Sequence, residues 1–135
     1  MRLALALLAL AACAESDLDR LEGLLASHPK VCAEYEDGYT SHISSDEMLA
    51  CMNDAYATGT LALTRSSRQD AYGFYVDTFL IAVDHQVRIF ERNPDGDDGS
   101  PGEPSARERP TCTGPFHLGT PDTTGFSALI VEGCP

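Results

Sequence analysis

The chain begins with an unbroken apolar run from Leu3 to Ala12, preceded by one positive charge at Arg2. These ten residues are too few for a permanent bilayer-spanning helix, which needs about 20. A basic start, a short apolar run and small residues after it are typical of a secretory signal. No second run of this kind follows, so we expect a signal peptide at residues 1–12 and a mature chain without a transmembrane helix.

A first amphipathic helix is predicted over residues 17–27, where apolar residues recur at helical spacing. Ser16 can cap its N-terminus, and Asp19 lies three residues further on, close to the capping-box pattern. Pro29 ends the helix, because the residue before a proline is disfavoured in the α region. The apolar stripe consists of Leu18, Leu21, Leu24 and Leu25.

A second helix is predicted over residues 45–58. Ser44 and Glu47 stand in capping-box register, and Gly59 can supply the left-handed C-cap. We expect its buried face to consist of Met48, Cys51, Met52, Ala55 and Tyr56.

Five further segments alternate with the period of a strand or form β-rich apolar runs. They are residues 39–43, 60–66, 72–83, 87–92 and 126–131. The third and fourth flank a compact turn at 84–86 and therefore predict a β-hairpin. The elements together predict one α+β domain at residues 17–135, with a four- to five-stranded, mostly antiparallel sheet. The second helix is expected to cover one face of this sheet, and the first helix to pack nearby.

Two polar segments are predicted to be loops. The first is Ser67-Arg68-Gln69-Asp70. The second, at residues 93–111, holds four prolines and three glycines and has no large apolar residue. Such a segment cannot bury enough surface to order itself, so we expect a flexible acidic loop there.

Cys13 directly follows the apolar run, in Leu10-Ala11-Ala12-Cys13. These four residues look like a bacterial lipobox, in which the cysteine receives lipid (palmitate among its acyl chains) and becomes the first residue of the mature protein. Residues 13–16 would then be the lipidated cysteine and a short tether. Ala12-Cys13-Ala14 also fits ordinary signal cleavage before Glu15, which would release a soluble secreted protein. We favour lipidation.

Four cysteines remain for the domain itself: Cys32, Cys51, Cys112 and Cys134. An even number in an exported chain implies two disulfides, which sequence alone could connect in three ways. We favour Cys32–Cys51 and Cys112–Cys134, because each closes a loop of about 20 residues, worth about 3 kcal/mol in the chain-entropy model. No cysteine pair has the C-x2-C spacing of structural zinc sites, so no metal is expected.

The formal net charge is −12, and loss of Arg2 with the signal makes the mature domain about one unit more negative. This acidity argues against binding to nucleic acid or to anionic lipid surfaces. It favours a basic partner, although surface acid also serves solubility alone.

No pattern of catalytic or cofactor-binding residues is recognisable. The acids at Asp95–Asp98 do not match a calcium-binding loop, because Gly99 comes one residue early and position twelve is Ala106. There is no nucleophile elbow and no glycine-rich phosphate loop. The four histidines lie far apart, at His28, His42, His85 and His117. We therefore expect no catalytic residue, cofactor or metal.

The order of features resembles a family of small bacterial lipoproteins of unknown function. The shared features are the lipobox, a short strand, a capped helix ending at Gly59, the strand "TLALT", an aromatic hairpin with an acidic turn, and Cys112 followed by a late "EGC". The resemblance covers roughly Tyr39 to Cys134. It implies an exported, membrane-anchored protein and adds support for the Cys112–Cys134 pairing, and it implies no activity.

These observations favour an envelope lipoprotein that faces the periplasm or the cell exterior. We expect a non-catalytic module that binds an envelope or secreted protein and is held at the membrane through lipid on Cys13. An inhibitor of a basic secreted enzyme, such as a lysozyme-like hydrolase, is the alternative that the acidic, disulfide-stapled scaffold favours. A plainly secreted soluble protein is the alternative if Cys13 leaves with the signal.

Overall fold

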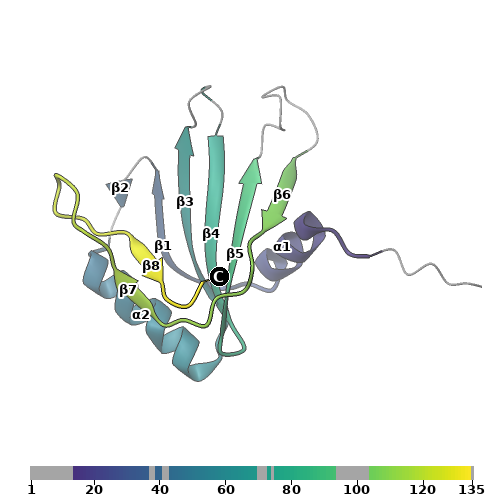
Figure 1. Cartoon of the computed structure of the whole chain (residues 1–135), viewed down its shortest axis with the longest axis horizontal. Helices are drawn as coiled ribbons and strands as arrows, with labels where there is room; N and C mark the ends of the chain where they lie inside the picture. Colours follow the sequence, from purple (N-terminus) through teal and green to yellow (C-terminus); the bar gives the residue numbers. More distant parts are fainter. Residues whose placement is uncertain are drawn as a thin grey trace, which may run out of the picture.

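The computed structural model describes residues 14–36, 39–40, 43–69, 73, 75–93 and 104–134. Within these ranges the chain forms two helices and eight strands (Figure 1). In chain order they are α1 Asp17–Ala26, β1 Lys30–Glu36, β2 Tyr39–Thr40, α2 Ser45–Thr58, β3 Ala62–Gln69, β4 Tyr75–Val83, β5 Gln86–Asn93, β6 Ser105–Glu108, β7 Phe116–Leu118 and β8 Leu129–Val131. Neither helix is long and apolar enough to cross a membrane.

The α+β class and the mostly antiparallel sheet are confirmed. The main sheet has the order β2-β1-β3-β4-β5-β6, and its five strands other than the two-residue β2 are four to nine residues long. All neighbouring strands pair antiparallel except β1 and β3. These two run parallel because α2 carries the chain back between them. The pattern of apolar residues did not predict β1, in which charged residues interrupt the alternation.

Helix α2 covers one face of the sheet, as predicted. Ser44 and Glu47 form the expected capping box, and Gly59 is the left-handed C-cap with φ +73°. The fully buried Met48 and Met52 belong to the apolar core between α2 and the sheet. The Cys32–Cys51 disulfide ties this helix to β1.

Helix α1 covers the opposite face, towards β6 (Figure 1). Its capping box at Ser16 and Asp19 is present as predicted. Leu21 is fully buried against Leu63, Phe79, Ile81 and Phe90. The sheet is therefore covered by one helix on each face, with one apolar core on each side of it.

The hairpin of β4 and β5 is confirmed, and its turn residues Asp84 and His85 have φ values of +49° and +60°. A tight hairpin turn of this kind needs positive φ at both central positions.

Two loop predictions are wrong in part. Ser67, Arg68 and Gln69 continue β3, because each pairs with β4. Residues 105–108, inside the segment predicted to be flexible, form the edge strand β6. Backbone pairing with β5, together with the ion pairs described below, orders this strand without an apolar side chain larger than alanine. Residues 94–103 of that segment lie outside the described residues.

The C-terminal part forms a small hairpin, β7 with β8, beside α2 (Figure 1). The predicted last strand is therefore confirmed over Leu129–Val131. Asn53 on α2 fixes β7, because its side-chain amide donates to the Phe116 carbonyl at 3.0 Å and accepts from the Phe116 N–H at 2.9 Å. The Cys112–Cys134 disulfide closes this part of the chain.

Candidate functional site

Among the described residues, three clusters of arginine and carboxylate side chains lie on or beside the sheet, and they contain six arginines. In each cluster two guanidinium groups hold one carboxylate, and in the first cluster Arg20 also pairs with Asp17. The Glu108 cluster contains Arg20 and Arg88, the Glu91 cluster contains Arg107 and Arg109, and the Asp77 cluster contains Arg65 and Arg92.

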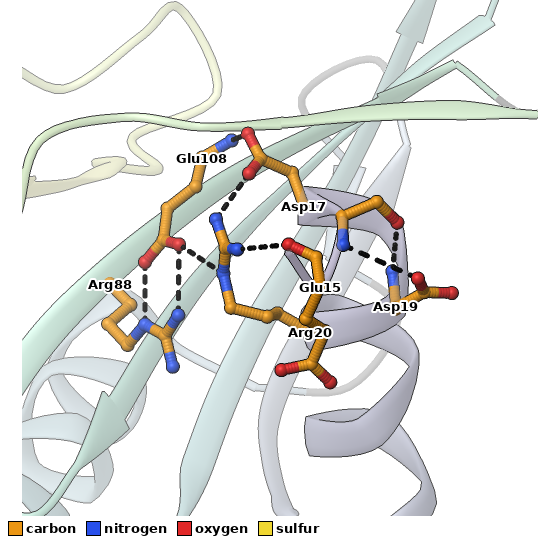
Figure 2. Close-up of polar contacts among 7 residues, drawn as sticks. Glu15, Asp17, Asp19, Arg20, Arg88 and Glu108 are labelled. Atoms are coloured by element: carbon orange, nitrogen blue, oxygen red, sulfur yellow. Dashed lines mark hydrogen bonds and ion pairs between the residues drawn. The ribbon is translucent and has the colours of Figure 1, made fainter. Parts of the chain in front are cut away.

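The Glu108 cluster pins α1 to the edge strand β6 (Figure 2). Arg88 donates through Nε and Nη2 to the two carboxylate oxygens at 2.6 and 2.9 Å, and Arg20 donates through Nε at 3.1 Å. The Glu108 N–H in turn donates to an Asp17 oxygen at 2.8 Å, and Arg20 also donates to the Glu15 carbonyl. The hydrogen bonds from Arg88 lower the pKa of Glu108 below its ordinary value, which keeps this carboxylate ionised.

The Glu91 cluster fastens the chain around β6 to β5. Arg107 and Arg109 both donate to the Glu91 carboxylate, Arg107 at 3.0 Å. Partial burial opposes ionisation of Glu91, but the hydrogen bonds from Arg109 and Arg107 outweigh it and leave its pKa below the ordinary value. Both arginine side chains are more than half exposed, so this cluster is largely open to solvent.

The Asp77 cluster is the most buried of the three, since the Asp77 side chain is only 2 % exposed. Arg65 on β3 and Arg92 on β5 both donate through Nη2 to the same oxygen, Asp77 Oδ2, at 3.1 and 3.0 Å. The Phe79 ring lies beneath both guanidinium groups, whose central carbons are 6.0 Å (Arg65) and 5.0 Å (Arg92) from its centroid. Stacking on an aromatic face is a favoured placement for a guanidinium group.

The backbone does not need the Asp77 cluster in order to hold its strands together. The strands β3, β4 and β5 that carry it pair along their length, whereas the four-residue β6 and the helix α1 also make the ion pairs of the other two clusters. Two positive charges share one carboxylate here, and the buried Nε atoms of Arg65 and Arg92 have no hydrogen-bond partner among the described residues. Buried N–H donors normally find acceptors, so this arrangement is incomplete as a purely structural ion pair.

The Asp77 cluster opens into a groove of about 310 Å³ beside the C-terminal end of α1, which we call the α1 groove. Leu63 and Phe79 contribute apolar surface from the sheet, and Arg65 and Arg92 contribute the charged part. The wall on the helix side is formed by Leu25, His28 and Pro29, and the wall on β1 by Val31 and Glu34. Val31 is 52 % exposed, the highest value among the large apolar residues whose burial is described.

A second hollow, of about 370 Å³, lies on the opposite face between the sheet and β8. It is lined by polar residues of β3, by Glu91 and Arg109 of the Glu91 cluster, and by the exposed Ile130. Arg68 and Arg109 line this hollow, and Arg109 already donates to Glu91. Among the described residues, neither arginine has a buried nitrogen that lacks a hydrogen-bond partner.

The predicted disulfides are both present, Cys32–Cys51 and Cys112–Cys134. Two disulfides indicate an oxidising, exported environment. The predicted lipidation site, Cys13, lies outside the described residues, as do His42 and the acids at 95–98.

The remaining histidines stay apart. His28 lies at the α1 groove, His85 binds the Tyr56 carbonyl through Nδ1 at 3.1 Å, and His117 lies 3.6 Å from Glu132. The described ranges contain no group of histidine, cysteine or acidic side chains arranged to hold a metal ion.

None of the residues of the Asp77 cluster is predicted from the sequence as a functional residue. A signal was present, because Asp77 alternates with Phe79 and Ile81 along a strand that is otherwise apolar. Residues at i, i+2 and i+4 of a strand share a face, so Asp77 is expected to be buried with Phe79 and Ile81 and to need cationic partners. The pairing with Arg65 and Arg92 depends on strand order, which the sequence does not state.

Comparison of the chain with models of protein families, with curated proteins and with solved structures found no match.

Proposed function

We propose that this protein is an exported bacterial envelope lipoprotein that binds a protein partner through the α1 groove and carries out no catalysis. The groove carries this proposal, because it combines exposed apolar surface at Val31 with two guanidinium groups that are not fully satisfied. Recognition sites in proteins combine apolar walls with a few well-placed polar groups in this way.

The position of α1 supports anchoring close to a membrane. Only three residues separate Cys13 from Asp17, the first residue of the helix, and the Glu108 cluster ties that end of the helix to the sheet (Figure 2). A lipid on Cys13 would therefore hold the domain directly against the membrane, with little slack in the tether.

The anchor is tested by expressing the full chain and its Cys13→Ser variant in a bacterial host and separating membrane from soluble fractions. We expect the wild type in the membrane fraction with an intact mass that exceeds the polypeptide starting at Cys13 by the lipid. We expect Cys13→Ser to lose both. A wild-type mass equal to the bare polypeptide starting at Glu15 would refute the anchor and show a secreted protein.

The binding function is tested with a photo-crosslinking amino acid at position 31, and at the similarly exposed Ile130 on the opposite face as a matched control. Irradiation of cells should yield a defined crosslinked protein from position 31 and none from position 130. Absence of a crosslink from position 31 would contradict the proposal.

An inhibitor of a basic secreted enzyme is a second candidate, favoured by one observation. Six of the nine basic side chains are paired with four carboxylates inside the three clusters, so the other 17 acids are accompanied by only three basic side chains. Inhibition of a lysozyme-like hydrolase by the purified domain at low salt would support this candidate, and the absence of inhibition would remove it.

A further inference from the structure

We infer that the α1 groove binds the C-terminal residue of a polypeptide, an apolar side chain together with its free α-carboxylate. The inference rests on the proposed binding function and names the chemistry of the partner. Its first support is the charge of the Asp77 cluster. Two guanidinium groups share a single carboxylate oxygen, so the cluster keeps one positive charge that Asp77 does not neutralise.

The second support is the unused hydrogen-bonding capacity of the two arginines. Each guanidinium group has five N–H donors, and the contacts to Asp77 use one nitrogen of each group. Arg65 lines the groove with a side chain that is 39 % exposed, so donors remain accessible from solvent. The planar fork of a guanidinium group matches a carboxylate, which it binds through two parallel hydrogen bonds.

The apolar part of the groove determines which side chain the ligand carries beside its carboxylate. Leu25, Pro29 and Val31 form walls above the buried Leu63 and Phe79, so an apolar side chain can bury its surface beside the arginines. The volume of about 310 Å³ lies at the lower limit of ligand pockets, which span roughly 300 to 1,000 Å³. It suits one residue rather than a long acyl chain. Capture of a terminal carboxylate is an established mode of peptide recognition.

One charge at the groove opposes such a ligand. Glu34 is exposed on the β1 wall, where it is the strand neighbour of Arg65. A carboxylate at this position repels the carboxylate of the ligand and lowers its affinity for the groove. Removing the charge of Glu34 should therefore raise that affinity.

The experiment measures fluorescence anisotropy of a labelled peptide that ends in Ala-Leu, added to the purified mature protein. The matched probe is the same peptide with a C-terminal amide. We expect the free acid to bind at micromolar to millimolar concentration and the amide at least tenfold more weakly. Equal binding of both peptides, or no binding of the free acid up to millimolar concentration, would overturn the inference.

Substitutions of exposed residues test where the peptide binds without disturbing the apolar core. Val31→Asp and Val31→Asn have the same shape and differ in charge, so we expect both to weaken binding of the free acid and Asp to weaken it about fivefold more. Glu34→Gln should strengthen binding about threefold. Ile130→Asp, on the opposite face, should leave it unchanged. Weakening by Ile130→Asp with no effect of Val31→Asp would contradict the assignment to this groove.

Arg65→Lys tests the guanidinium fork itself. Lysine keeps a positive charge beside Asp77, so the fold is retained, but it cannot bind a carboxylate through two parallel donors. We expect about a tenfold loss of affinity for the free acid and no change for the amide, and unchanged affinity for the free acid would contradict the inference. If the peptides fail to discriminate while the crosslink at position 31 persists, the protein binds a partner there by other chemistry.

Discussion

Asp77 is an acid in the middle of an apolar strand, with Phe79 and Ile81 following it on the same face. A buried carboxylate is tolerated only when it is paired and hydrogen-bonded. Arg65 and Arg92 supply that pairing from the two neighbouring strands, and Phe79 supports both of them. One residue thus links the stability of the sheet to the charge of the α1 groove.

Replacing Asp77 with asparagine keeps the shape and removes the charge. Two guanidinium groups then remain partly buried without a counter-ion, and breaking a buried pair in this way is strongly destabilising. We expect Asp77→Asn to lower the free energy of unfolding by about 3 kcal/mol in urea titrations. Asp54→Asn, which removes the same charge from an exposed position on α2, should change it by less than about 0.5 kcal/mol. Similar losses for both variants would show that Asp77 has no special role.

At the scale of elements, the Glu108 cluster helps to hold α1 on the sheet. An isolated helix of ten residues is marginal in water, so α1 depends on the burial of Leu21 and on its ties to β6. These ties join residues about ninety positions apart in the chain. They hold the first helix of the fold to one of its later strands.

This contact predicts how stability depends on pH. The folded-state pKa of Glu108 lies below its ordinary value, so its contribution is complete above the ordinary value of about 4.5 and is lost as the pH falls through the lower, folded-state value. Glu108→Gln should therefore cost about 2 kcal/mol at pH 7. The difference from the wild type should shrink steadily as the pH falls below about 4.5.

Urea titrations at a series of pH values measure this difference. Glu22→Gln, at an exposed position on α1, is the matched control and should follow the wild type throughout. A constant difference between Glu108→Gln and the wild type down to pH 2 would contradict the linkage.

Elements with strong local signals could be predicted from the sequence, and those held by distant contacts could not. The capping boxes at Ser16 and Ser44, the left-handed Gly59 and the β4–β5 hairpin all depend on residues a few positions apart. Strand β6 has no apolar pattern that could predict it. It is held in place by backbone pairing with β5 and by two arginine clusters. Strand β1 lies next to the short edge strand β2, and its alternation is broken by charges and by a bulge between Val31 and Ala33.

At the scale of the whole molecule, the two disulfides fasten different regions. Cys32–Cys51 joins α2 to β1, and Cys32 is buried in the core. Cys112–Cys134 closes the part of the chain that contains the β7–β8 hairpin, and Cys134 is exposed. The first therefore secures the centre of the fold and the second secures its C-terminal end.

Paired serine substitutions should separate these roles in native-state hydrogen exchange. We expect Cys112→Ser with Cys134→Ser to speed exchange at the β8 amides while the amides of β3, β4 and β5 keep their protection. Cys32→Ser with Cys51→Ser should lower protection in all strands of the sheet and cost about 3 kcal/mol overall. Equal and uniform loss of protection in both variants would contradict this division.

The order of the cysteines along the chain affects how the two disulfides form after export. Each disulfide joins a cysteine of the domain to the next one along the chain, Cys32 to Cys51 and Cys112 to Cys134. A translocated chain presents its thiols from the N-terminus onward, so an oxidase that joins each new thiol to the one before it makes the native bonds directly. In an oxidising, exported environment an oxidant that acts in this order is then enough to form both native disulfides, with no exchange of wrongly paired cysteines.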